Sequence, residues 1–222
     1  MFCLLLLHMV FRLLDDEYIF PDTALAEPDG LLAIGGDLSV ERLLLAYQRG
    51  IFPWFSEGDP ILWYAPHERC IIFPDRINIS KSMRKIINSG TFEVTVNQSF
   101  AAVICNCAQT PRLGQDGTWI TDAMQKAYIK LHEQGLAHSV EVWQDQVLVG
   151  GLYGVKIGKV FCGESMFSLV SNASKAALIH LAKNMGFELI DCQLPNDHLM
   201  SMGAEMMSRN DYLKVLSFNV IK

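Results

Sequence analysis

Three polar residues in the second half of the chain could do chemistry together. Asp191 and Gln193 lie two positions apart in the motif IDCQ, at the end of a predicted strand, and Glu164 lies in the motif CGES of an earlier strand. Alternate residues of a strand share a face, so we expect Asp191 and Gln193 to point the same way. An unpartnered carboxylate is costly to bury, which favours a functional role for this pair.

Acyl transfer to an amine would suit these residue types. An amine that attacks an activated ester needs positioning, a proton acceptor and a donor for the developing oxyanion. Asp191 could orient or deprotonate the amine, and the Gln193 amide could align it or stabilise the oxyanion. Structural roles stay open for both carboxylates: a strand-end hydrogen-bond partner for Asp191, and a salt bridge or turn cap for Glu164.

Other catalytic classes have weaker support in the sequence. Cys192 is followed by His198, but strand alternation turns Cys192 to the opposite face, with Ile190, where a free cysteine acts as a small apolar residue. The G-x-S-x-G motif of serine hydrolases is absent. No paired Cys/His spacing indicates a metal site, since Cys105 and Cys107 should lie on different sides of one helix.

The elements that must position these residues follow a regular order. Three extended segments form an antiparallel meander: HSVEVW, VLVGGLYGV and VFCGESMF. A helix capped by Asn172 or Ser174 and ended by Gly186 follows, and Phe187–Gln193 then alternates as a strand. This order predicts an α+β (mixed α/β) fold and is similar to the GNAT-type acyltransferases. Their CoA-binding motif, Q/R-x-x-G-x-G, is replaced here by SLVSNASK, so we expect a donor other than acetyl-CoA.

The first part of the chain is organised differently. Its segment IFPWFSEGDPILWYAP concentrates aromatic residues between prolines and a glycine, which indicates either a packed loop or a stacking platform for a base or an apolar ligand. A boundary near Pro66 divides the chain into a small N-terminal domain, residues 1–66, and a catalytic domain, residues 67–222. We interpret residues 1–8 as a non-native extension or floppy tail, with translation starting at Met9.

Composition limits the class of protein. Of the 222 residues, 50% are hydrophobic and 19% are charged, which is typical of a globular protein. The formal net charge of -6 argues against a general nucleic-acid binder, although it is compatible with a local basic patch. The 6 cysteines lack framework spacing, which favours a reducing cytoplasm. The apolar start MFCLLLLHMVFRLL is too short to span a membrane.

A series of irregular motifs makes the interpretation more specific. In chain order they are GLLAIGGDLS, AYQRGIFPWFS, DPILWYAP, GTWI, HSVEVW, GGLYGV, FCGESMFS, NASK and IDCQLPNDH. This series resembles the leucyl/phenylalanyl-tRNA–protein transferases, over a stretch from about Phe20 to Leu216. The resemblance implies a small N-terminal domain followed by a GNAT-like domain.

The resemblance also implies a reaction. Such enzymes take Leu or Phe, and less often Met, from its charged tRNA and attach it by a peptide bond to an N-terminal Arg or Lys of a protein. The product carries an N-degron for protein degradation. The resemblance implies no cofactor; we expect no membrane association, a cytoplasmic location and a monomer. Two alternatives stay open: a GNAT-like acyltransferase with another donor, and a non-catalytic tRNA-binding module.

Site residues follow from the same resemblance. The proposed catalytic pair falls on Asp191 and Gln193, with Glu164 helping to hold the acceptor or the catalytic network. The residues matching the aminoacyl-adenosine site and the apolar donor pocket are Trp54, Trp119, Leu152, Phe161, Met166, Leu181 and Ile190. The helix after Ser80 carries a run of basic residues: Lys81, Arg84 and Lys85. By itself this run is compatible with a solvated face or a phosphate-contacting surface. The resemblance implies that it meets the tRNA acceptor stem.

Overall fold

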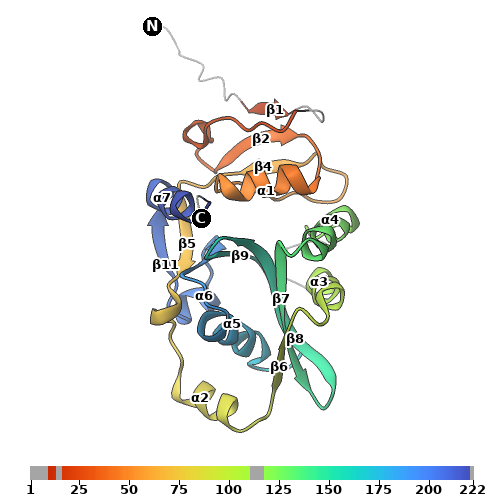
Figure 1. Ribbon diagram of the computed structural model, residues 1–222, viewed down its shortest axis with the longest axis vertical. Helices are drawn as coiled ribbons and strands as arrows, with labels where there is room; N and C mark the ends of the chain where they lie inside the picture. The colour runs from red at the N-terminus through yellow and green to blue at the C-terminus, as the bar shows by residue number, and fades with distance from the viewer. Residues whose placement is uncertain (1–9, 14–16, 111–117, 221–222) are drawn as a thin grey trace, which may run out of the picture.

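The computed structural model describes residues 10–13, 17–110 and 118–220, so the expected start at Met9 and the extension 1–8 lie outside the described residues. Helices and two separate β-sheets make up this part of the chain, which confirms the α+β class (Figure 1). The smaller sheet is built from residues before Pro66 and the larger one from residues after it. The division into two domains stays a prediction.

The smaller sheet holds the aromatic segment in place. Its strand order is β1-β2-β4-β3. Trp63 at its centre is fully buried, packs edge-on against Phe20 at 4.9 Å between ring centroids, and donates its indole N–H to the Gly35 carbonyl at 2.8 Å. The element bounds are β1 (Phe11–Leu13), η1 (Thr23–Leu25), β2 (Leu31–Gly35), α1 (Val40–Gln48), β3 (Phe52–Pro53) and β4 (Leu62–Tyr64).

The larger sheet contains the predicted meander. Its strand order is β11-β5-β10-β9-β8-β7-β6; the β9–β10 pair is parallel and the other pairs are antiparallel. Sequence patterns missed β11, which pairs with β5 at the sheet edge. The bounds are β5 (Glu68–Ile72), β6 (Glu93–Val96), β7 (Ala137–Gln144), β8 (Val147–Ile157), β9 (Val160–Ser168), β10 (Leu189–Gln193) and β11 (Glu205–Ser208).

Helices cover both faces of the larger sheet (Figure 1). Helices α3 and α4 pack on one face, where the core is continuous with that of the smaller sheet, while α5 packs on the other face over a second core. The last helix, α7, returns to pack against α1 and β5, so the end of the chain stabilises its beginning. The bounds are η2 (Pro74–Arg76), α2 (Lys81–Asn88), α3 (Phe100–Gln109), α4 (Asp122–Glu133), α5 (Ala173–Asn184), α6 (Asp197–Ser201) and α7 (Arg209–Val220).

Glycine in β8 permits an irregularity in β9. The β8–β9 register shifts because Gly154 pairs with Gly163 and Tyr153 with Ser165, which leaves Glu164 as the extra residue of a β-bulge. A Cβ atom at Gly154 would lie 2.2 Å from the Cys162 carbonyl oxygen, so a side chain there would clash with the backbone of β9. The glycine therefore allows the close approach of the strand that carries Glu164.

Candidate active site

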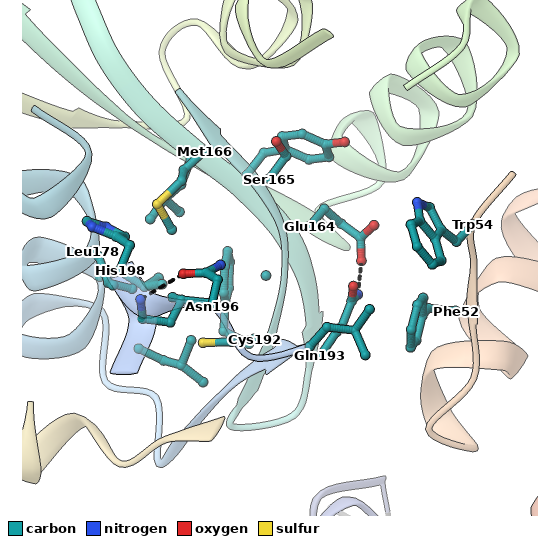
Figure 2. Close-up of a pocket in the computed structure, with 18 of the residues that line it drawn as sticks. Phe52, Trp54, Glu164, Ser165, Met166, Leu178, Cys192, Gln193, Asn196 and His198 are labelled. Atoms are coloured by element: carbon teal, nitrogen blue, oxygen red, sulfur yellow. Dashed lines mark hydrogen bonds between the residues drawn. The ribbon is translucent and has the colours of Figure 1, made fainter. Parts of the chain in front are cut away.

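A cavity opens where two central strands part. Strands β9 and β10 pair only as far as Cys162 and Asp191, after which β9 continues to Ser168 paired with β8 and no longer with β10. The cavity beyond this point has a volume of about 960 Å³ and is closed on one side by β3 and Trp54 of the N-terminal part. Figure 2 shows a polar group at one end, where Glu164 and Gln193 lie near Phe52 and Trp54, and Met166 and Leu178 at the other end.

Glu164 is the buried carboxylate that lines this cavity. Its Oε1 accepts hydrogen bonds from the Tyr47 hydroxyl at 2.6 Å and the Gln193 amide at 2.7 Å, and its Oε2 accepts from the Tyr128 hydroxyl at 3.2 Å. Burial raises the pKa of Glu164 to about 7, against the opposing effect of these three donors and with a further upward contribution from the negative charge of Asp191. Glu164 can therefore exchange a proton near neutral pH.

This raised pKa has a consequence for stability. The pKa of Glu164 is about 7 in the folded protein against an ordinary value of 4.5, so the folded state binds the proton more tightly. The resulting stabilisation is complete below pH 4.5 and is lost as pH rises to about 7. We expect the free energy of unfolding of the native protein, relative to Glu164→Gln, to fall by about 3 kcal/mol over this interval. Urea unfolding of both proteins at several pH values measures it; a constant difference would contradict the assignment.

Gln193 enters the cavity through a second irregularity. The β10–β5 register shifts between Asp191 and Gln193, and Gln193 has a φ of 63°, an uncommon value for a residue with a side chain. That Asp191 and Gln193 point the same way stays a prediction, but the two side chains differ in their access to the cavity. Gln193 lines the cavity, whereas Asp191 is fully buried and is not among the lining residues.

Asp191 forms a buried ion pair with Arg69 of β5. The Arg69 Nη2 and Nε atoms lie 2.6 and 3.2 Å from the two carboxylate oxygens, and the Tyr212 hydroxyl donates to Asp191 Oδ2 at 2.7 Å. Asp191 Oδ1 also accepts the Gln193 backbone N–H at 2.8 Å. The carboxylate is thus fully occupied by protein donors, and its direct effect on the cavity is to fix the backbone of Gln193.

Arg69 was not identified from the sequence. Its guanidinium lies over the rings of Phe52 and Tyr212, at 4.9 and 4.7 Å from their centroids. Burial alone would lower the pKa of Arg69, but the Asp191 carboxylate more than offsets this and raises it, so the arginine stays charged. The available signal was an arginine directly before the buried run CII, since a charged residue inside an apolar strand requires a partner.

The apolar residues singled out from the resemblance lie together. All of them line the same cavity: Trp54, Trp119, Leu152, Phe161, Met166, Leu181 and Ile190. Trp54 is 37% exposed and packs edge-on against Tyr64. The structure adds Phe52, Leu178 and His198 to the lining, and these were missed because no strand or helix pattern in the sequence indicates which side of a loop or helix faces a cavity.

Cys192 is poorly suited to act as a nucleophile. It lines the cavity with Ile190, on the face predicted by alternation. A hydrogen bond with Cys70 and burial both raise the pKa of the Cys192 thiol, which keeps it protonated. Its place in the wall is that of a small apolar side chain.

The basic run lies away from the cavity. Lys81, Arg84 and Lys85 are exposed on α2, which Figure 1 shows at the end of the molecule opposite the smaller sheet. Ser80 caps this helix by accepting the Met83 N–H at 3.1 Å, and Met83 is buried below it. The three side chains therefore form a fixed, solvent-facing cationic surface.

The described ranges offer neither a metal-ligating cluster nor a membrane span. Among these residues, His, Cys, Asp and Glu side chains form no group of three that could ligate a metal ion. In that part of the chain, every helix is too short or too polar to cross a lipid bilayer.

Comparison with known proteins identifies two matching family models. The model described as "Leucyl/phenylalanyl-tRNA protein transferase" matches residues 71–217, and the one described as "Leucyl/phenylalanyl-tRNA protein transferase N-terminal domain" matches residues 36–67. Relatives named leucyl/phenylalanyl-tRNA–protein transferase include that of Flavobacterium johnsoniae, 57% identical over 203 residues, or 90% of this chain and 96% of the relative. That of Cellvibrio japonicus is 54% identical and covers 89% of this chain and 86% of its own.

Solved structures overlap with the chain only partly. A GCN5-related N-acetyltransferase from Kribbella flavida covers 73% of this chain and 58% of its own, at 12% identity and a TM-score of 0.37. A conserved protein of unknown function from Bacteroides thetaiotaomicron covers 63% of this chain and 58% of its own, at 13% identity and a TM-score of 0.43.

Proposed function

The chain belongs to the leucyl/phenylalanyl-tRNA–protein transferase family and is an aminoacyltransferase, and we propose that it moves Leu or Phe, and less often Met, from charged tRNA to an N-terminal Arg or Lys of acceptor proteins. The observation that carries this proposal is the cavity in which an apolar lining meets Glu164 and Gln193. The acceptor product would carry an N-degron, and the enzyme would act as a cytoplasmic monomer without a cofactor.

The apolar end of the cavity supports the choice of donor. Leu152, Met166, Leu178, Leu181 and Ile190 offer aliphatic and thioether surface to a side chain placed among them, with Asn196 and His198 beside Leu178 (Figure 2). Burying a Leu or Phe side chain there contributes about 1.5–3 kcal/mol of binding free energy. Unbranched or γ-branched side chains fit a deep apolar slot, whereas we expect β-branched donors such as Val and Ile to be excluded at its mouth.

The polar end supports a direct transfer between ester and amine. The acceptor α-amine would hydrogen-bond to the Gln193 amide oxygen, because the amide nitrogen is already committed to Glu164. Its nitrogen then attacks the ester carbonyl: a C–N bond forms, the C–O bond to the terminal ribose breaks, and the ribose oxygen leaves and gains a proton. Glu164 accepts the proton released by the amine, which its pKa of about 7 permits at neutral pH, and then returns that proton to the departing ribose oxygen.

Asp191 has an indirect part in this mechanism. Because both of its oxygens are occupied by Arg69, Tyr212 and the Gln193 backbone, we assign it to positioning Gln193 and not to proton transfer. The acceptor's cationic side chain would be attracted to the rim, where Asp197 is an exposed carboxylate among the lining residues.

A transfer assay tests the proposal. Radiolabelled Leu-tRNA and Phe-tRNA are incubated with the enzyme and with two peptides that differ only in an N-terminal Arg or Ala. We expect label on the Arg peptide alone. If the protein is folded and binds tRNA but leaves the charged tRNA intact, the result supports a non-catalytic binding module. If CoA competes with an aminoacyl-adenosine analogue for the cavity, the result supports a different acyl donor.

The basic surface of α2 gives a separate prediction for tRNA. Replacing Lys81, Arg84 and Lys85 with Ala should weaken tRNA binding equally for Leu-tRNA and Phe-tRNA, because phosphate contacts do not read the amino acid. We expect the slope of log K against log salt to decrease by about one for each phosphate interaction that the substitutions remove. Filter binding at several salt concentrations measures it. A matched control replaces three exposed lysines elsewhere, Lys126, Lys130 and Lys214; an equal effect in this control would contradict a dedicated surface.

A further inference from the structure

The Glu164 carboxylate is part of a closed hydrogen-bonded ring. Tyr47 donates to its Oε1 at 2.6 Å, Tyr128 contacts its Oε2 at 3.2 Å, and the two tyrosine hydroxyls are hydrogen-bonded to each other. Each member comes from a different element: Tyr47 from α1, Tyr128 from α4 and Glu164 from the bulge of β9. The ring thus joins the N-terminal part of the chain to the catalytic sheet.

Both tyrosines are held in place and stay protonated. Tyr47 is 1% exposed and Tyr128 is fully buried, and their rings pack edge to face with centroids 6.5 Å apart. Burial, reinforced by the neighbouring Glu164 charge, raises the pKa of both phenols well above the ordinary value. Each hydroxyl therefore contributes one proton, which it can donate in only one direction at a time.

Counting protons around the ring shows what it can hold. Three oxygen–oxygen contacts are present, and the two tyrosines supply two protons. With Glu164 ionised, one contact has no proton between its oxygens. With Glu164 protonated at Oε2, the protons run in one direction: from Oε2 to Tyr128, from Tyr128 to Tyr47, and from Tyr47 to Oε1. The protonated ring is complete, and Gln193 continues to donate to Oε1 in either state.

We propose that Tyr47 and Tyr128 are positioning residues that prepare Glu164 to accept the proton of the acceptor amine, a role that rests on the proposed transfer reaction. Both hydroxyls donate to the ionised carboxylate, and Tyr128 turns to accept from Oε2 once the proton has arrived. The transferred proton moves from the amine nitrogen to Oε2, and no other bond to hydrogen is lost. Proton transfer to Oε2 leaves the carboxyl group neutral in a buried position, where an unpaired charge is costly. It also explains why two tyrosines from distant elements converge on one carboxylate.

Other ionisable groups face the ring from neighbouring strands. Asp191 of β10 adds a negative charge, which Arg69 of β5 balances from its other side. Cys162 of β9 stays a neutral thiol because burial raises its pKa, and Tyr153 of β8 packs edge-on against Tyr128 at 5.7 Å between centroids.

The test is a titration that needs no substrate. Side-chain carboxyl groups of glutamate are labelled with ¹³C, and the Glu164 signal is assigned by its loss in Glu164→Gln. We expect its midpoint near neutral pH in the native protein. Tyr47→Phe and Tyr128→Phe each remove a donor to the carboxylate, so each should raise the midpoint by about one pH unit. The acidic limb of the kcat/KM profile should move in the same direction.

Controls separate the possible outcomes. Tyr64→Phe, a tyrosine of the smaller sheet that does not contact Glu164, should leave the midpoint unchanged. Thermal unfolding establishes that the variants are folded, and the native titration remains informative if one of them is not. A native midpoint near that of an ordinary glutamate, or unchanged midpoints in both folded variants, would overturn the ring. Shifted midpoints without any aminoacyl transfer would retain the ring and reject the proposed reaction.

Discussion

Arg69→Met is expected to destabilise the folded protein by about 3–5 kcal/mol, because it leaves the fully buried Asp191 without its counter-ion. Methionine retains an unbranched apolar stem and removes the guanidinium that lies over the Phe52 and Tyr212 rings, so the loss reports mainly on the charged group. The carboxylate would retain only its neutral donors, Tyr212 and the Gln193 N–H. Urea unfolding at neutral pH measures the change.

A double variant identifies the cause of this loss. Arg69→Met combined with Asp191→Leu removes both charges, and replacing a buried pair by apolar residues is often close to neutral. We expect the double variant to recover part of the lost stability but little activity, because Gln193 has lost its backbone anchor. If Arg69→Met cost less than about 1 kcal/mol, the buried ion pair would not be holding the strand end as described.

Gln193→Leu should lower kcat/KM for aminoacyl transfer by about 10²–10³-fold, the effect of removing one preorganised polar group at a reacting centre. Leucine keeps the approximate size but cannot accept a hydrogen bond from the acceptor amine or donate to Glu164. The loss should appear mainly in kcat, since the apolar donor pocket is unchanged. Steady-state transfer to an Arg-starting peptide at saturating Phe-tRNA measures it.

A nearby surface variant provides the comparison. Glu188→Gln alters an exposed residue just before β10, whose carboxylate pairs with Lys159, and should transfer at the native rate. If the Gln193→Leu protein binds tRNA, unfolds at the native temperature and still transfers at the native rate, Gln193 has no part in the mechanism. Glu164 would then have to accept the proton from an amine that Gln193 does not position.

The sequence was informative where local rules apply. Alternation and turn residues predicted the β7–β8–β9 meander and the strand that carries IDCQ, because side-chain direction within a strand depends only on its immediate neighbours. The placement of Ile190 and Cys192 on one face was confirmed for the same reason. The short edge strand β11 was missed, because its pairing with β5 is a long-range contact that leaves little local pattern.

The candidate site was only partly predictable. Motifs brought Glu164, Gln193 and the apolar lining into one hypothesis, and all of them line one cavity. Asp191 was expected to act with Gln193, but it is buried outside the cavity lining, and two register shifts, at Glu164 and before Gln193, interrupt the regular strand pairing where the site forms. Bulges of this kind depend on both paired strands, so the sequence of one strand does not reveal them.

The sequence by itself determined the family, the residue types of the reaction and the apolar character of the donor pocket, because these depend on side-chain chemistry and on motifs within short segments. Only the tertiary structure decided which carboxylate faces the cavity. Asp191 meets Arg69 from 122 positions away in the chain, and Glu164 meets Tyr47 across 117 positions. Charge state and access depend on such distant partners, and no local pattern encodes them.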